Sequence, residues 1–547
     1  MAFSLSGFKY LFIIIFVVGI TWQVQGQKIS VNDTYAQEIA RIQQVLGQDS
    51  SIASFAIRPI LPFEDSILNL LTSSKNLFGN SNDYSPAIEF KALPLNFLSE
   101  YNNSRPFGNN NGSLFPNRGF QEAVSGGFYL RIGPLTVQAK PEFIYAQNKP
   151  FATFADVQGN NSSQQLLDAY FHTVNGIDAP ERFGNGDLSK LYPGQSKMTL
   201  NLGKLEIGAS TENLWWGPGV KNSIMMSNSA PGFLHWTINS NSPVSTSIGS
   251  FEWQVIGGYL KQSGYPPTDI ARLVYAGNLH IPKPNVTRYL SAFTLNWQPK
   301  WMRGFFIGLS EYDYLNIDSA YKSYGLLKKL FPVITGSSKK ANAISSSQNG
   351  DGQDFAFSIN MRQVFEKEKA EIYFEWARND NWASLTDLLQ EPEHSSAYTL
   401  GGRKLYDVAA QSYIQVKFEL THLQDPPTYL LRDEPSWYVH LQAPQDGYTN
   451  DGRYIGAGIG PGSNSFMFDL SYLHQQNAFG FQFERIVHNN DLYYSAFAGT
   501  NTFNLHWVDL ANTFYYNLKR GNILIASELT PVYTLNYEYK QGSSYMG

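Results

Sequence analysis

Two short alternating segments between residues 196 and 219 constrain the fold of this chain more than any other stretch. Met198, Leu200 and Leu202 share one side of the first segment, polar residues share the other, and the alternation resumes after Gly203. A period of two gives a β-strand one apolar and one polar face. The segment ends in the run Trp-Trp-Gly-Pro-Gly at 215–219. Such strands with an aromatic end are typical of outer-membrane barrels, which have an apolar lipid face and aromatic rims.

The same alternation recurs along most of the chain, for example at 370–376, 414–420 and 479–484. Charged residues recur in the middle of these segments on the polar face, which suits a water-filled lumen better than the core of a soluble sandwich. Short connections alternate with long polar ones, as they do in barrels with short periplasmic turns and long outward loops. The sequence therefore predicts an all-β membrane protein, an antiparallel barrel of about 18 strands, with 16 as the alternative.

The first residues have the pattern of a secretory signal. Lys9 precedes the apolar run 10–20, and short residues precede Gln27, so we expect a signal peptide over 1–26. The chain contains no Cys, which excludes a lipid-anchored lipoprotein, disulfides and thiolate zinc sites. A net charge of −5 gives no support to nucleic-acid binding.

Three further segments follow the signal. Residues 27–118 contain helix-like apolar spacing at 35–46 and 64–78, which predicts a small N-terminal periplasmic or plug segment. A partly ordered linker is the alternative for this part. We expect the barrel over 119–540, with its last strand closing at 537–539, and a short tail over 541–547.

Motifs for catalysis or metal binding are weak. The nine His show no metal-ligand spacing, and neither a Gly-x-Ser-x-Gly elbow nor a phosphate-binding loop is present. Residues 349–354 resemble half of a calcium loop, but position twelve is Asn360 and a solvated turn is the better interpretation. We predict no catalytic residue, no cofactor and no metal. An outer-membrane hydrolase that uses His394 and Ser395 is the least favoured of the functions considered.

The Trp pair at 215–216 has two interpretations, because an indole ring is both a membrane-interface anchor and a flat platform for a sugar. We favour the rim anchor, at the outward end of a strand. Glycan contact is expected instead on outward loops, where aromatic rings lie near carboxylates and amides. The candidates are Asp380, Trp382, His394, Tyr398, Trp437 and Tyr448.

Several motifs together resemble the capsule-assembly proteins of the Wzi family. The most specific is Asn213-Leu214-Trp215-Trp216-Gly217-Pro218-Gly219; segments 105–108, 118–121, 133–135, 141–143, 392–398 and 455–464 match in the family's order. The resemblance covers about residues 85 to 540.

This resemblance implies an outer-membrane barrel of 18 strands with a small periplasmic helical part, and a lectin-like, non-enzymatic role. The implied partners are capsular or extracellular polysaccharide, outer-membrane lipid and other capsule-export components. The same alternation is compatible with a porin or channel, which is the alternative function. The chain lacks the terminal aromatic residue common in such barrels.

Overall fold

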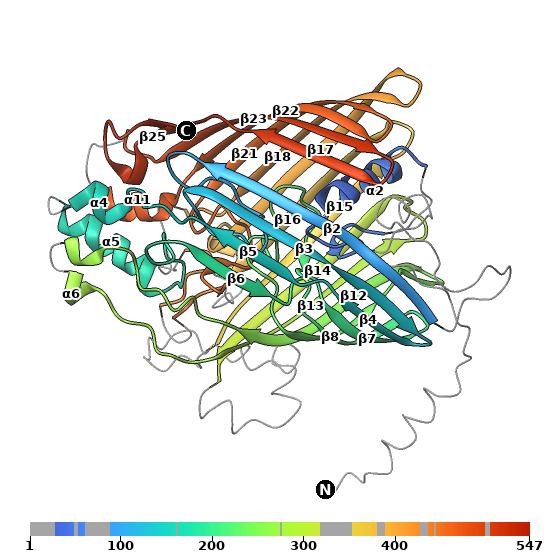
Figure 1. Cartoon of the computed structure of the whole chain (residues 1–547), viewed down its shortest axis with the longest axis horizontal. Helices are drawn as coiled ribbons and strands as arrows, with labels where there is room; N and C mark the ends of the chain where they lie inside the picture. Colours follow the sequence, from blue (N-terminus) through green and yellow to red (C-terminus); the bar gives the residue numbers. More distant parts are fainter. Residues whose placement is uncertain are drawn as a thin grey trace, which may run out of the picture.

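The alternating segments form the wall of a β-barrel (Figure 1). The computed structural model describes residues 28–48, 53–60, 88–159, 162–273, 276–317, 353–379, 389–426, 436–441, 445–497 and 504–547. On β21 (Asn464–His474), Phe466, Phe468 and Leu470 are exposed on the outer face, whereas Asp469 and Ser471 are buried on the inner face. An apolar outside and a polar inside confirm the predicted outer-membrane type of fold.

Neighbouring wall strands pair in antiparallel register, as in β17 (Ser396–Ala409) with β18 (Ser412–His422) and β21 with β22 (Asn477–Val487). The remaining wall strands are β2 (Ile88–Asn102), β3 (Gly119–Ile132), β4 (Leu135–Ala139), β5 (Glu142–Ala146), β6 (Leu188–Tyr192), β7 (Lys197–Leu202), β8 (Leu205–Ser210), β10 (His235–Ser240), β11 (Val244–Thr246), β12 (Gly249–Leu260), β13 (Arg288–Pro299), β14 (Phe305–Asn316), β15 (Gln353–Phe365), β16 (Ala370–Asn379), β23 (Val508–Arg520), β24 (Ile523–Leu529), β25 (Val532–Leu535) and β26 (Tyr545–Met546).

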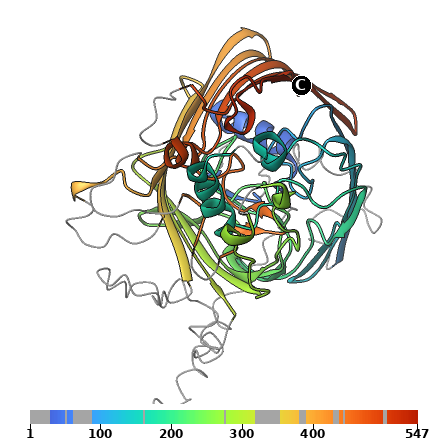
Figure 2. The same cartoon turned by 90° about the vertical axis from the view of Figure 1, so that its left-hand side faces the viewer.

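The two ends of the barrel differ in their connections. Short turns join strands at one end, the turn end; between β7 and β8 the turn needs Gly203 at φ 64°, a conformation that favours glycine. Long connections gather at the other end, the loop end. There a helical cap crosses the opening (Figure 2), and it consists of α4 (Phe154–Gln158), α5 (Gln164–Asn175), η2 (Ile270–Arg272), α6 (Ala276–Leu279), α11 (Asn490–Phe497) and η3 (Tyr537–Tyr539).

None of the helices in the described ranges is long and apolar enough to cross a membrane.

Inward-folded connections occupy part of the barrel interior. Residues 211–234, after β8, and the described parts of 423–463, after β18, meet in a large buried apolar cluster that includes Trp216, Trp437 and Tyr448. Two small sheets lie among them: β1 (Ile57–Arg58) pairs with β9 (Trp215–Trp216), and β19 (Thr449–Asn450) pairs with β20 (Arg453–Tyr454). The long connection after β18 is therefore not simply an outward loop.

The structure moves two of the predicted boundaries. The wall begins at β2, well before residue 119, because β2 pairs with β3 over most of its length. At the other end the last strand does not close at 537–539: Asn536, Glu538 and Tyr539 have positive φ, so the chain turns in η3 and returns as β26 beside β25. The predicted signal peptide and the helix at 64–78 lie outside the described residues.

Candidate functional site

The helix α2 (Thr34–Val45) lies inside the barrel near the turn end (Figure 1). The Asp33 side chain accepts a hydrogen bond from the Ala36 amide and caps the first turn. One apolar side of the helix packs through Ala40 against Phe55, and another packs through Val45 against inward residues of the wall. The helix predicted at 35–46 is confirmed within one residue at each end.

The third side of α2 is polar, because Glu38, Arg41 and Gln44 are three residues apart and share one face of a helix. Arg41 donates from Nε to Glu371 Oε1 at 2.8 Å. Glu38 accepts hydrogen bonds from both Nη atoms of Arg403, at 3.0 and 2.9 Å. Gln44 accepts from Arg362 at 2.7 Å. Each polar residue of this face therefore has a charged partner on the wall.

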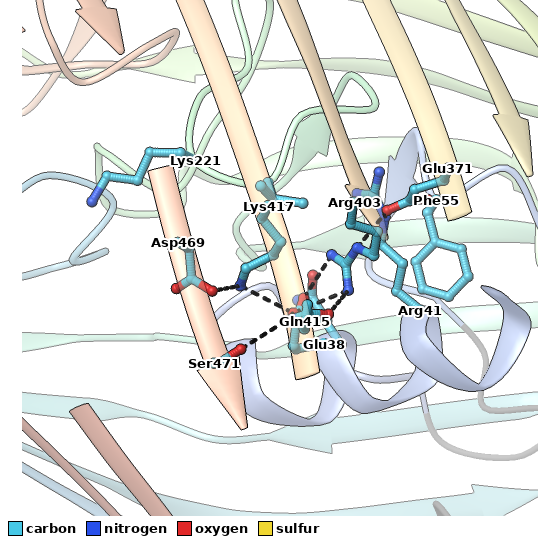
Figure 3. Close-up of polar contacts among 12 residues, drawn as sticks. Glu38, Arg41, Phe55, Lys221, Glu371, Arg403, Gln415, Lys417, Asp469 and Ser471 are labelled. Atoms are coloured by element: carbon cyan, nitrogen blue, oxygen red, sulfur yellow. Dashed lines mark hydrogen bonds and ion pairs between the residues drawn. The ribbon is translucent and has the colours of Figure 1, made fainter. Parts of the chain in front are cut away.

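These contacts form one network, which we call the lumenal ion-pair cluster. It consists of Glu38, Arg41, Arg362, Glu371, Arg403, Lys417 and Asp469, of which Figure 3 labels all but Arg362. Its centre is Glu371, which is fully buried and lies 2.6 to 2.8 Å from nitrogens of three arginines. Glu38 also pairs with Lys417 at 3.2 Å. Charged groups buried to this extent are stable only when each has a partner, so the cluster fixes α2 to the wall.

The Trp pair lies in the lumen, which corrects the predicted rim position. Trp216 is fully buried and its indole N–H donates to Gln254 at 3.0 Å. Trp215 is 4% exposed. The guanidinium of Arg58 lies over its ring, 4.9 Å from the ring centroid. The chain folds inward after β8, so the Trp pair forms the inner sheet with β1 instead of reaching the membrane surface.

A large cavity lined by both polar and apolar side chains runs beside α2, with a volume of about 1710 Å³. We call it the lumenal cavity. It is bordered by α2, by the first wall strand β2, and by the last strands from β18 to β26. Trp215, Arg41 and Lys221 are among its lining residues, together with many Asn, Gln and Tyr side chains. Amide and hydroxyl groups around a space of this size suit a hydroxyl-rich ligand.

The predicted loop candidates do not form one surface. Trp437 and Tyr448 are fully buried, with Tyr448 stacked on Tyr312 at 3.9 Å, so neither ring is available to an external glycan in this conformation. The aromatic surface of their connection is buried in the lumen, where it contributes to the core. Tyr398 lies on the outer face of β17, where its ring stacks on His422.

His394 and Ser395 are both buried at the start of β17, so no nucleophile is presented at a surface there. Asp380 and Trp382 lie outside the described residues, as do residues 349–352 of the half calcium loop, whereas Gln353 and Asp354 begin β15. Within the described ranges, no group of three or more acidic or His side chains is arranged to hold a metal ion.

Three buried carboxyl groups at the cap have pKa values above the ordinary range. Burial raises the pKa of Glu181 to about 7, with the charges of Asp156 and Asp269 acting in the same direction, while its carboxylate accepts the Phe154 amide at the start of α4. Burial likewise raises the pKa of Asp491, in the first turn of α11, to about 7. Burial and the nearby Glu181 raise the pKa of Glu538, against the opposing charge of Arg105.

We expect the cap to be more stable at pH 5 than at pH 8. Between the ordinary Glu value of 4.5 and about 7, the folded cap holds protons that an unfolded chain has released, so its stability falls as pH rises. Hydrogen-exchange protection of α5 and α11, corrected for intrinsic rates, should therefore decrease across this interval. Glu181→Gln should reduce the pH dependence while its amide oxygen still accepts from Phe154. Equal protection at both pH values would contradict the expectation.

The wall, the polar lumen and the docked helix define a class of protein: a β-barrel of the outer-membrane type with an internal plug-like helix. Over residues 101–507 the chain matches the family of the capsule assembly protein Wzi. The chain belongs to this family.

One solved structure has the same fold. The chain is similar to Wzi of Escherichia coli, described as an outer-membrane protein involved in group 1 capsule assembly and as a carbohydrate-binding β-barrel. The two share 10% identity over 95% of this chain and 96% of that chain, with a TM-score of 0.53, which shows the fold. OccAB4 of Acinetobacter baumannii has 10% identity over 82% and 95% of the two chains and a TM-score of 0.36. Among curated proteins no match is found.

The sequence interpretation missed the lumenal ion-pair cluster as a unit. A signal for it is present, since the spacing of Glu38, Arg41 and Gln44 puts three polar groups on one side of an otherwise buried helix. A buried polar stripe on a helix indicates a charged partner surface. Charged inward positions on the wall strands, including Glu371 and Lys417, supply that surface.

Proposed function

We propose that this protein is a non-catalytic, lectin-like protein of the bacterial outer membrane that binds capsular or extracellular polysaccharide and helps retain it at the cell surface. Membership of the Wzi family carries the proposal. The lumenal cavity supports it, because its lining includes amides, carboxylates and aromatic rings, which are the groups that hold hydroxyl-rich chains. Contacts with other capsule-export components stay a prediction.

A channel for small polar solutes is the second candidate, and the same cavity is the observation that favours it. Against it, α2 and the buried apolar cluster occupy much of the barrel interior. Planar-bilayer recording separates the two functions. Conductance near background together with glycan binding supports the lectin-like role, whereas a large steady conductance without glycan binding supports a channel.

The expected result of deleting the gene is a shift of polysaccharide from the cell-attached to the released fraction, with total synthesis unchanged. The reason is that a retaining protein acts after export, so its loss affects attachment and not production. The measurement compares uronic-acid or total-hexose content of washed cells and culture medium. A complemented strain is the control. Unchanged attachment would remove the proposed role.

A further inference from the structure

The lumenal cavity extends over most of the height of the barrel wall. At the turn end its lining includes Gln411, Gln475 and Gln476, which lie in the short connections next to β18, β21 and β22. Toward the loop end it reaches Asn109 and Asn110, which follow β2. The cavity is therefore an elongated space along one side of α2, a shape that fits an extended chain better than a compact solute.

The wall of this space carries inward polar residues in two rows set by strand register. The first row is Lys417, Asp469, Gln482 and Thr513, and the second is Gln415, Ser471, Tyr515 and Glu528, each residue opposite the next on the neighbouring strand or separated only by Gly480. All of these except Ser471 line the cavity. Rows of amide, carboxylate and hydroxyl groups at strand spacing can bond successive hydroxyls of one chain.

Tyr515 supplies a flat apolar surface within these rows. A Cβ placed on Gly480 would lie 2.3 Å from Tyr515 Cζ, so the ring crosses the wall at the position where the neighbouring strand has no side chain. Its hydroxyl donates to Asp469 Oδ2 at 2.8 Å. The ring is half-buried, rests on the sheet at Gly480 and borders the cavity. A fixed aromatic ring with carboxylate and amide neighbours stacks on the C–H face of a sugar while the neighbours bond its hydroxyls.

Unpartnered buried polar atoms in residues that line the cavity also support a polar ligand. Among the described residues, Glu484 Oε1, Trp215 Nε1 and both Nη atoms of Arg41 have no hydrogen-bond partner, and all three residues line the cavity. Each of these side chains is at least nine-tenths buried. Unpartnered buried polar groups are rare because each loses its hydration without compensation. A hydroxyl-rich chain offers both the donors and the acceptors that such groups lack.

We propose that the lumenal cavity is a glycan-binding site that takes an extended segment of polysaccharide, with Tyr515 as its stacking residue and Asp469, Gln482 and Glu484 as hydrogen-bonding residues. The proposal rests on the proposed lectin-like function and locates its binding site inside the barrel instead of on the outward loops.

The test uses the full chain in detergent and surface polysaccharide extracted from the bacterium in which the chain is native. Tyr515→Ala should bind this polysaccharide about tenfold more weakly, because a ring contact is removed. Tyr516→Ala is the matched control: it changes the same residue type at the next position of β23, on the outer face, where Tyr516 is 46% exposed. Tyr515→Phe keeps the ring and should bind nearly as the parent does.

A second measurement does not depend on comparing the folding of variants. The chain has no Cys, so Asn517→Cys places one thiol on the cavity wall. A bulky maleimide on this thiol should abolish binding, and prebound polysaccharide should slow the labelling. Unhindered labelling and unchanged affinity of Tyr515→Ala overturn the lumenal site and leave the lectin-like function to the loops. A parent protein that binds no polysaccharide removes both proposals.

Discussion

Glu371→Ala is expected to destabilise the folded barrel by about 3–5 kcal/mol, because it leaves buried charges without their partner. Glu371 is the carboxylate on which Arg41, Arg362 and Arg403 converge, and it is fully buried. Arg41 has no other hydrogen-bond acceptor in the described ranges, so α2 also loses an attachment to the wall. Urea unfolding of the protein in detergent, followed by tryptophan fluorescence, measures the loss. Bilayer conductance should rise if α2 becomes displaceable.

Glu366→Ala is the matched control, since Glu366 also pairs with an arginine but does so at the turn end in contact with water. Arg303 lies 3.2 Å away with 75% of its side chain exposed. An exposed pair of this kind contributes about 0–1 kcal/mol, so the control should unfold close to the parent. If the two alanine variants lost the same small amount of stability, the lumenal ion-pair cluster would not be what fixes α2.

The wall of the barrel was predictable from sequence because a single local rule produces it. A strand facing lipid on one side and a polar lumen on the other alternates with period two, and β16 shows this directly: Ile372 and Phe374 are exposed while Glu371 and Glu375 are buried. The amphipathic spacing that predicted α2 is equally local. Both features depend only on residues a few positions apart.

The interior was not predictable for the opposite reason. Glu38 and Arg403 are separated by 365 positions, and no periodicity in either segment selects the other as a partner. Aromatic residues add a second ambiguity, because a ring loses contact with water equally well at a membrane interface and inside a packed lumen. Trp216, Trp437 and Tyr448 were therefore assigned to the rim or the loops, although all three are buried in the core of the barrel.

The Trp pair itself now has two separate roles. Trp216 sits in the apolar cluster, its amide donates to Met226 at 3.0 Å, and its strand partner is Ile57. It therefore joins three segments that are distant in sequence: the β1 segment, the connection after β8 and, through Gln254, the wall strand β12. Trp215, its neighbour, lines the lumenal cavity instead.

Trp216→Ala is expected to lower the free energy of unfolding by about 3–5 kcal/mol, because it removes a fully buried indole and leaves a void that rigid wall strands cannot collapse to fill. It also leaves Gln254 Oε1 without its donor. Urea unfolding in detergent gives the change, and heat-modified mobility on gels reports whether the barrel assembles. Trp301→Ala is the control: that ring is 68% exposed beyond β13, so its loss should change stability by no more than about 0.5 kcal/mol. A Trp216→Ala variant as stable as this control would contradict the buried position of Trp216. It would favour the rim position instead, where a solvent- or lipid-facing indole contributes little to folding.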